Sequence, residues 1–451
     1  MRFKRRRQLF KASLSSILLA SIVPLLSPIS SSAQAKTYDK PIRIMVPALP
    51  FFDLVIQHLK KISKDNNFLI EIDVVPYLEM RSAQLSELQK KHGKYDLIII
   101  LAAWKTEYAA LNLLTNLSTE QKSNRLKLDD INDFIPAYLT VAGKVGGERG
   151  YLDGPNAQLF ALPLGADTSI LGYRSDIFQK YNWTPPANYD ELLALLPLIR
   201  KHEPTLTPLC SRGARGHQIT HAWLLHFNAF GGQVFDKVWR PSVNNAAGLK
   251  AIEVLIAIHA STPNGILDKL FADMGNAFIT GNAVMYLDSS TVLSVVNDPV
   301  KSLVQDKVAF SLHPKGSVHS SETGGFAVAV PKNATSIDKS LQLLANITGK
   351  AQERAMARKG GIPCRTSTLH DAELLEIFPE YAVLAKQIEY ANPNWRPIIP
   401  EWTYINEQIL GTLIHDAVAG LITPVTALAQ AEEKMTMLMK SSGRYRNKAT
   451  S

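Results

Sequence analysis

Apolar residues along the chain fall into short continuous runs and into sets with helical spacing. The runs predict strands over 42–46, 68–75, 95–101, 284–287, 308–312 and 326–330. The helical spacing predicts helices over 54–62, 78–91, 189–199, 246–260, 337–345, 407–420 and 425–439. Because nearly continuous apolar strands alternate with amphipathic helices in the first part, we expect an α/β fold with a parallel sheet covered on both faces.

One predicted helix has a clear start signal and an internal breaker. Asn188 provides a side-chain acceptor for the first helical N–H groups, and Glu191 follows three positions later in the pattern of a capping box. Pro197 lies inside the same apolar face and lacks the N–H that a helix interior needs. We therefore expect Pro197 to kink or shorten this helix.

The first 35 residues are typical of an export signal. A basic start precedes an apolar stretch over 12–26 and a small-residue exit, Ala33-Gln34-Ala35. The stretch is too short for a membrane anchor, so we expect cleavage after Ala35 and a mature protein in the periplasm. The segment Arg6-Arg7-Gln8-Leu9-Phe10-Lys11 fits either a twin-arginine signal or the basic region of the general secretory route. At the other end, the polar residues 441–451 are expected to form a flexible tail.

The net charge of the mature protein is too small for a nucleic-acid-binding protein. The chain of 451 residues carries 49 Lys and Arg against 40 Asp and Glu, but six of the basic residues lie in the leader. The mature part therefore holds 43 basic and 40 acidic residues, which argues against a nucleic-acid partner. Its two cysteines, Cys210 and Cys364, are either a disulfide or two buried thiols, and the sequence leaves both open.

A series of short motifs resembles one family in its order along nearly the whole mature chain. The segments resemble those of the extracellular solute-binding proteins of ABC importers, family 1, and in part its sugar- and polyol-binding branch. They are Tyr95-Asp96-Leu97-Ile98-Ile99 with Trp104, Leu162–Thr168, Gly172–Phe178, Tyr189–Leu192, Thr207–Gly213, Gly231–Asp236, Gly281–Tyr286, Gly324–Lys332 and Ile399–Trp402.

The resemblance implies a two-lobed periplasmic-binding-protein fold of type II, with a hinge and an inter-lobe cleft. It places 36–165 and 315–361 in a first α/β lobe, and 166–314 and 362–440 in a second. It also implies capture of a small carbohydrate or polyol and its delivery to an inner-membrane ABC permease, without catalysis and without a cofactor. We expect the protein to act as a monomer.

Candidate ligand-binding residues are those that combine aromatic faces with charged or hydrogen-bonding groups near the expected cleft. Trp104 follows a buried strand, Asp167 lies at the expected lobe crossing, and Arg212 lies in a glycine-punctuated loop whose other arginine, Arg215, is expected to face solvent. The full set of candidates is Phe51, Glu79, Trp104, Asp167, Arg212, His217, Asp288, Glu401 and Trp402.

Two other functions remain open from the residues alone. An exported carbohydrate-active hydrolase would need paired carboxylates, which the sequence has in many places. A metal-binding receptor would use His217 and His221, which stand four residues apart, but no third ligand completes a motif. The expectation is therefore a binding protein with no metal.

Overall fold

The computed structural model describes residues 40–66, 69–146, 156–392 and 394–443. The predicted export signal and most of the predicted tail lie outside these residues. Within them, no helix combines the length and the apolar character needed to cross a membrane.

The first sheet holds strands from three separate parts of the described chain. Its order is β2-β1-β3-β11-β6. Strand β1 pairs in parallel with β2 and with β3, as predicted, whereas β11 is antiparallel to both β3 and β6. The bounds are β1 Ile42–Ala48, β2 Ile70–Pro76, β3 Leu97–Leu101, β6 Ala161–Asp167 and β11 Gly324–Ala329.

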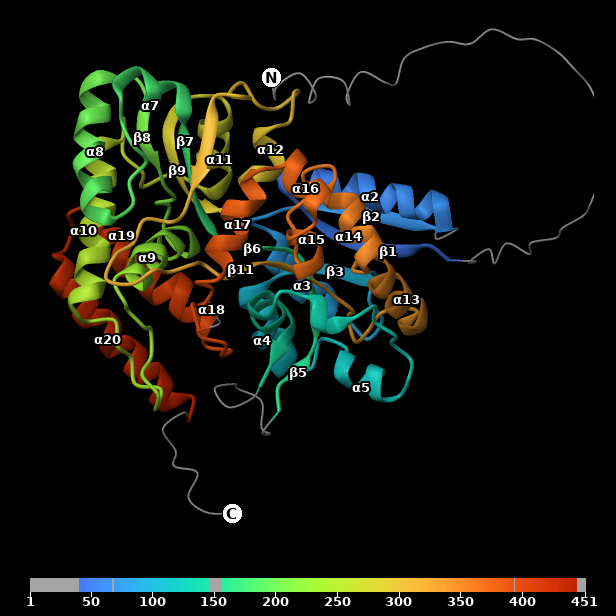
Figure 1. Ribbon diagram of the computed structural model, residues 1–451. Helices are drawn as coiled ribbons and strands as arrows, with labels where there is room; N and C mark the ends of the chain where they lie inside the picture. Colours follow the sequence, from blue (N-terminus) through green and yellow to red (C-terminus); the bar gives the residue numbers. More distant parts are fainter. Residues whose placement is uncertain (1–39, 67–68, 147–155, 393, 444–451) are drawn as a thin grey trace, which may run out of the picture.

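The second sheet is formed by the chain between these strands. Its order is β10-β7-β9-β8, in which only the β8–β9 pair is parallel among the described strands. The bounds are β7 Ser169–Arg174, β8 Thr207–Cys210, β9 Ala283–Ser289 and β10 Val308–Ser311. The chain thus crosses between the sheets at Thr168, between β6 and β7, and crosses back between β10 and β11. Figure 1 shows the two sheets in separate halves of the molecule.

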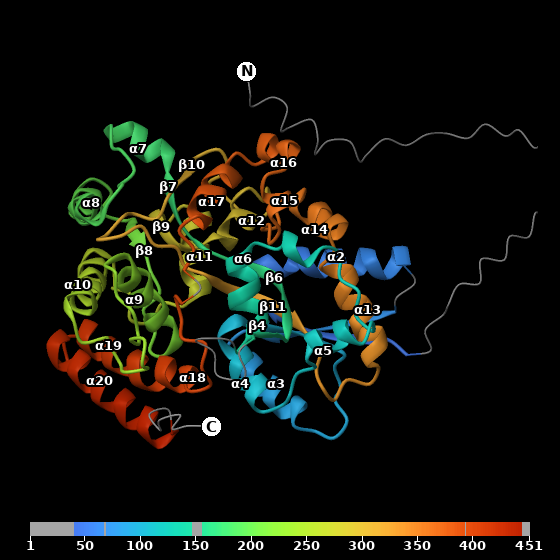
Figure 2. The same cartoon turned by 60° about the horizontal axis from the view of Figure 1, so that its bottom comes forward.

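Helices cover both sheets. Those packed with the first sheet's half include α2 Pro50–Asn66, α3 Met80–Leu88, α4 Lys105–Ala110, α13 Ile337–Ile347 and α14 Lys350–Ala357. Those of the second half include α8 Tyr189–His202, α9 His217–Ala229, α10 Ala246–Ser261, α11 Phe271–Ile279, α19 Gly411–Val418 and α20 Pro424–Ser441. Figure 2 shows α9, α10, α19 and α20 gathered on one side of the second half.

The segment after α14 lies where the two halves meet. Leu369, Leu374 and Leu384 of α15 Thr366–Leu369, α16 Ala372–Ile377 and α17 Glu380–Ile388 belong to an apolar core that holds the first sheet and also residues of the second half, such as Phe278 and Tyr286. Apolar residues from Trp395 onward belong to the second core, and α17 contacts β7 and β10. The predicted lobe boundaries, with 362–440 in the second lobe, stay a prediction.

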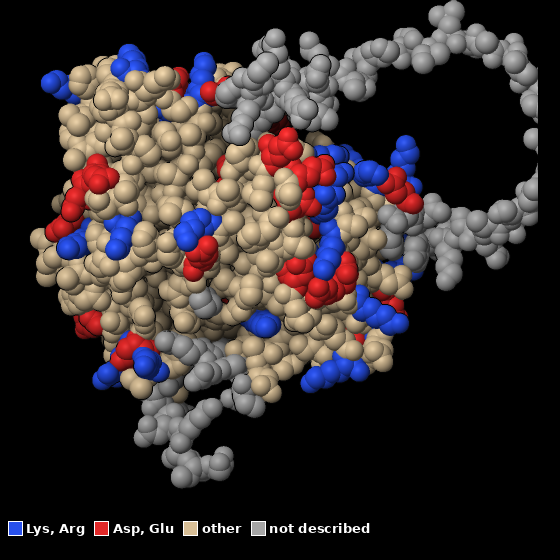
Figure 3. Space-filling model, viewed as in Figure 1, with Lys and Arg blue, Asp and Glu red and all other residues tan. Residues whose placement is uncertain are grey.

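The structure confirms the predicted helix cap at Asn188 but not the predicted shortening of the helix at Pro197. Asn188 caps α8 by accepting from Glu191 N at 2.9 Å, and Glu191 Oε2 accepts from Ala187 N at 2.7 Å. Pro197 does not shorten α8, because the helix continues to His202 with Leu196 and Ile199 buried against the second core. The cysteines Cys210 and Cys364 are buried free thiols, one of the two states that the sequence left open. Acidic and basic side chains are interspersed over the face in Figure 3, without a large basic patch.

Candidate functional site

Six ionisable side chains meet where the two sheets come together, each with at most 5% of its surface exposed. We call them the interface cluster: Asp167, Arg212, His221, Asp288, Glu322 and Arg396. Asp167 ends β6 and Glu322 stands two residues before β11, so both come from the first sheet's side. Asp288 in β9, Arg212 after β8 and His221 in α9 come from the second. The cluster therefore joins groups from both halves of the molecule.

Arg212 and Asp288 form a closed ion pair within this cluster. Arg212 Nε donates to Asp288 Oδ2 at 2.9 Å, and Arg212 Nη2 also bonds Asp288 Oδ1. The guanidinium carbon lies 4.4 Å from the centre of the Phe271 ring. Burial by itself raises the pKa of Asp288, but the charge of Arg212 holds the pKa below its usual value. Asp288 is therefore a paired carboxylate.

Asp167 and Glu322 are bonded less completely than Asp288. Asp167 Oδ2 accepts a bond from the Ser289 hydroxyl, whereas Asp167 Oδ1 is buried without a hydrogen-bond partner. Glu322 Oε1 accepts from Arg396 Nη2 at 3.4 Å. The pKa of Asp167 lies well above its usual value because of burial and then the charge of Glu322. These two carboxyl groups are thus less well compensated than Asp288.

Gly324 lies close against these groups. A Cβ on Gly324 would lie 3.0 Å from Arg396 Nη1, 3.1 Å from Glu322 Oε1 and 3.6 Å from Asp167 Oδ1. Three charged side chains therefore converge on one point beside the start of β11, where the residue has no side chain of its own.

The cluster contains donor atoms of a metal-binding type, but arginines contact them. His221 Nε2 lies 3.4 Å from Asp288 Oδ1 and 3.2 Å from Glu322 Oε2. Arg212 Nη2 lies 3.0 Å from the same His221 nitrogen, and Arg396 Nη2 contacts His221 Nδ1. Two guanidinium charges at the imidazole disfavour a further cation there. His217, the other histidine of the predicted metal pair, instead bonds Asn406 at 2.9 Å through Nδ1.

Several buried polar atoms in and near the cluster, together with one atom of Trp402 in the neighbouring α18, have no hydrogen-bond partner. Buried polar groups are nearly always paired, so such atoms indicate groups available to a ligand. The acceptors are Asp167 Oδ1, Glu322 Oε2 and Asn406 Oδ1, and the donors are Arg396 Nε, Trp395 Nε1 and Trp402 Nε1, joined by the Thr323 hydroxyl. The six named side chains other than Thr323 are at least 95% buried. Donors and acceptors are thus present in equal number.

The structure brings several predicted site residues together. Asp167, Arg212 and Asp288 lie in the cluster, and the partly buried His217 ring lies 5.9 Å from that of His221. Trp402 begins α18 Trp402–Tyr404, which packs across the halves against η1 Ala102–Trp104, the short helix that ends in Trp104. Arg215 is exposed, as predicted, and pairs with Asp416, whereas Arg212 is buried in the cluster.

The other predicted residues lie outside the cluster. Phe51 is buried, and a Cβ on Gly165 would lie 2.4 Å from its ring, so Phe51 packs behind β6. Glu401 is half-buried at the start of α18. Glu79 is exposed at the start of α3 and makes no side-chain cap bond, so the structure does not place it among the buried polar groups.

Sequence reasoning missed four residues of this region: Glu322, Trp395, Arg396 and Asn406. Glu322 stands just before Gly324-Gly325 in a polar segment, and Trp395-Arg396 lies between prolines in a loop. An aromatic residue beside a charged one in such a loop was the available signal. Asn406 had none, because it lies within a helical apolar pattern.

A second polar contact joins the halves near α18. Arg81 of α3 donates to Glu107 of α4 through Nη2 at 2.6 Å and Nε at 3.2 Å. Glu107 Oε2 also accepts from the Thr403 hydroxyl at 3.2 Å. This three-residue contact, the Arg81–Glu107–Thr403 bridge, connects the first half to α18 of the second.

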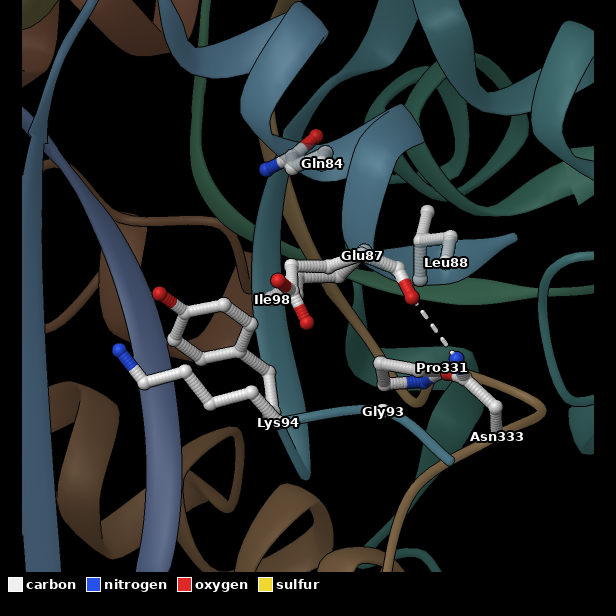
Figure 4. A pocket seen from close by; sticks show the side chains of 9 residues that line it. Gln84, Glu87, Leu88, Gly93, Lys94, Ile98, Pro331 and Asn333 are labelled. Atoms are coloured by element: carbon white, nitrogen blue, oxygen red, sulfur yellow. Dashed lines mark hydrogen bonds between the residues drawn. The ribbon is translucent and has the colours of Figure 1, made fainter. Parts of the chain in front are cut away.

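Two surface hollows lie elsewhere. The hollow in Figure 4 lies beside α3 and is partly filled by Asn333, which donates to the Glu87 carbonyl at 2.9 Å. A groove of about 690 Å³ lies between the loop 236–242 and α20, lined by charges of both signs such as Arg240 and Glu432. Neither hollow is lined by a residue of the interface cluster.

Comparison with protein families decides the class of this chain. Residues 60–354, more than half of the chain, match the family of bacterial extracellular solute-binding proteins. The chain belongs to this family. It is therefore a solute-binding component of an ABC importer and not an enzyme, and the family acts outside the cytoplasm.

Individual relatives are distant in sequence but similar over their whole length. A protein of Sinorhizobium fredii named "Probable amino-acid ABC transporter periplasmic-binding protein y4oP" is 23% identical, covering 97% of this chain and 99% of the relative. The mannitol-binding protein of Pseudomonas aeruginosa is 24% identical, covering 86% and 91%. The solute-binding protein of Agrobacterium radiobacter K84 crystallised with ribitol has a TM-score of 0.78 at 23% identity, covering 88% of this chain and all of that one. The two-lobed fold is thereby confirmed.

Proposed function

We propose that this protein captures a small carbohydrate or polyol at the interface cluster and delivers it to an inner-membrane ABC permease. The observation that carries the proposal is the matched set of buried, unpartnered donors and acceptors around Asp167, Arg396 and Asn406. A hydroxyl group both donates and accepts, so a chain of hydroxyls suits such a mixed set. The mannitol-binding relative and the ribitol complex support the same ligand class.

The ligand is held between the two halves of the molecule, which close around it. A ligand that bonds Asp167 on one side and Asn406 on the other contacts both, and so binds the closed arrangement better than an open one. Rigid halves moving about the crossings between the sheets are a known form of such closure. The permease then receives the ligand unchanged.

The test is a thermal-shift screen of the mature protein against sugars, polyols and amino acids, followed by calorimetric titration. A ligand that binds only the native state raises the melting temperature by mass action. We expect polyols or sugars to give the largest shifts and to be recovered intact. If amino acids alone shift the melting temperature, the proposed ligand class is wrong.

A pair of variants links the binding to the site. Trp402→Phe removes one unpartnered N–H and retains an aromatic ring, so we expect roughly tenfold weaker binding, in line with about 1.4 kcal/mol for one lost bond. Arg215→Ala, in the exposed part of the loop that carries Arg212, is the control and should retain full affinity. Equal affinities of wild type and Trp402→Phe would remove Trp402 from the site.

We also propose that the exported protein begins at Lys36 and acts as a monomer. Mass spectrometry of the periplasmic protein tests the first point, since cleavage after Ala35 fixes its mass. Light scattering coupled to size-exclusion chromatography tests the second, and a dimer mass would contradict it.

A further inference from the structure

Arg396 belongs to the proposed ligand site, but its own chain segment does not hold its side chain in place. It lies in the irregular segment before Pro397, outside any helix or strand. Its Nε is buried without a hydrogen-bond partner among the described residues, and its bond to Glu322 Oε1 is long at 3.4 Å. Because an arginine side chain has many rotamers, fixing it costs conformational free energy. A neighbouring group must therefore hold the guanidinium for Nε to face a ligand.

His221 is the side chain with the contacts to do this. It stands on α9, is 2% exposed, and contacts Arg396 Nη2 through Nδ1. Its ring centre lies 5.3 Å from that of Trp395 in an edge-to-face arrangement, and the Arg396 guanidinium carbon lies 4.4 Å from the centre of the same Trp395 ring. Arg396 thus contacts an indole ring and an imidazole nitrogen, and both of these partners are themselves buried.

The contacts of His221 decide which of its ring nitrogens carries the proton. A guanidinium group only donates hydrogen bonds, so Nδ1 can bond Arg396 only as an acceptor. The proton then lies on Nε2, where the carboxylate oxygens Glu322 Oε2 and Asp288 Oδ1 stand at 3.2 and 3.4 Å. Arg212 Nη2 lies 3.0 Å from the same nitrogen and also bonds Asp288, so it keeps a partner in this arrangement. His221 is therefore a neutral imidazole with its proton on Nε2.

From these contacts we propose that His221 is a positioning residue of the ligand site, which holds the Arg396 guanidinium through an unprotonated Nδ1 so that Arg396 Nε faces a ligand hydroxyl group. This inference rests on the proposed function and adds to it the residue that orients one of the donors. A donor that is fixed before binding needs no further ordering when the ligand arrives. His221 therefore contributes to affinity without touching the ligand.

Calorimetric titration with D-mannitol and ribitol tests the role. His221→Phe retains a ring and removes the acceptor, so we expect roughly tenfold weaker binding, the equivalent of one lost bond to the ligand. His221→Asn should restore the affinity to within about threefold of wild type, because its amide oxygen is an acceptor near the place of Nδ1. His226→Phe is the matched control and should retain full affinity, since His226 is buried on the same helix but bonds Tyr189. Melting temperatures verify that every variant is folded.

A double-mutant cycle with Arg396→Gln separates positioning from direct contact with the ligand. If His221 acts through Arg396, His221→Phe should weaken binding in the wild-type background but change the affinity by less than about twofold where Arg396 is already replaced. Losses that multiply in the double variant would show that His221 acts by another route and would overturn the proposal.

Nuclear magnetic resonance of the ligand-free mature protein with 15N-labelled histidine tests the tautomer directly. The Nδ1 resonance of His221, identified by its absence from the His221→Asn spectrum, should have the chemical shift of an unprotonated nitrogen. A proton on Nδ1 would make the inference wrong and leave the proposed function standing.

The binding results also separate this inference from the proposed function. If wild type and His221→Phe bind a polyol equally well, only the positioning role is wrong. If wild type binds neither polyol but binds a sugar of the wider screen, that sugar serves as the probe. If the screen finds no sugar or polyol at all, the proposed function fails and this inference fails with it.

Discussion

Gly324 is the residue at which a single added carbon should act on binding without damaging the fold. Its Cβ would press against Arg396 and Glu322 and contact Asp167, and the atoms it would meet belong to the ends of side chains. We therefore expect Gly324→Ala to weaken ligand binding at least tenfold while the melting temperature changes by only a few degrees. Calorimetric titration and thermal unfolding measure the two effects.

The neighbouring Gly325 is the contrasting control. Its φ is +78°, and a Cβ would lie 2.3 Å from the Gly165 carbonyl oxygen, so the obstacle is backbone. Gly325→Ala should lower the melting temperature strongly, because L side chains disfavour that conformation and β6 cannot move aside cheaply. Normal ligand affinity in Gly324→Ala would contradict the position given to the site.

Lys105 is a buried lysine that supports the scaffold of the first half. Its ammonium group has no exposed surface and donates to the carbonyls of Val141 at 2.6 Å, Thr140 at 3.2 Å and Lys144, around the end of η3 Leu139–Gly143. Lys105→Met would leave these carbonyls unpaired, and we expect about 3 kcal/mol lower unfolding free energy. Chemical denaturation measures it, with the exposed Lys60→Met as control. An unchanged unfolding free energy would show that water replaces the ammonium group.

At the scale of elements, one hydrogen-bond chain ties α8 and α9 to the segment after β10. The Tyr189 hydroxyl lies 2.8 Å from His226 Nδ1 and 3.0 Å from His313 Nε2, and His313 Nδ1 lies 2.9 Å from the Ser169 hydroxyl. Burial lowers the pKa of each histidine to about 3. At His226 the neighbouring His313 lowers the pKa further, and at both histidines the charge of Asp288 acts in the opposite direction. Both histidines are therefore neutral in the native state.

The two buried, neutral histidines predict that the protein loses stability in acid. In the unfolded chain the histidines take up protons near pH 6.5, so their contribution to stability is complete above pH 6.5 and is lost as the pH falls toward 3. Replacing one of them, in His313→Gln, should reduce the slope of unfolding free energy against pH by about 1.4 kcal/mol per unit over that range. Thermal and chemical unfolding from pH 7 to 4 measures the slope. The exposed His92→Gln is the control, and equal slopes for wild type and His313→Gln would refute the assignment.

For the whole molecule, the balance between open and closed arrangements depends on the contacts that cross the halves. The Arg81–Glu107–Thr403 bridge is one such contact, and an exposed ion pair between Lys301 and Asp53 is another. Contacts formed only on closure stabilise the closed state independently of the ligand, and so raise ligand affinity.

Thr403→Val tests the bridge. It removes the hydroxyl that donates to Glu107 and keeps the side-chain shape, so we expect a roughly threefold to tenfold loss of ligand affinity from one hydrogen bond. Small-angle scattering of the unliganded variant should show a larger radius of gyration. Thr280→Val is the control, because its hydroxyl bonds within α11 of one half. An unchanged affinity would mean that the bridge does not act in closure.

Much of the architecture could be read from local patterns. The strands over 42–46, 95–101 and 326–330, the capped helix from Asn188, and the order of family motifs all depend on neighbours in the chain, where hydrophobic period and capping chemistry act. The same patterns indicated Asp167, Arg212 and Trp402, because each stands next to a strand end, a glycine loop or a proline. Glu79 was chosen on the same kind of evidence, yet it is exposed.

The sequence by itself therefore determined the class of fold and the receptor family, since these depend on short-range pattern, and it selected Asp167, Arg212 and Asp288, which the structure places in the interface cluster. Only the tertiary structure decided which charges face one another. Asp167 and Glu322 are 155 positions apart and Arg396 is further still, and no local pattern reveals that they meet beside Gly324. The physical reason is that burial and pairing of a charge depend on the three-dimensional surroundings, which chain crossings between two sheets bring together.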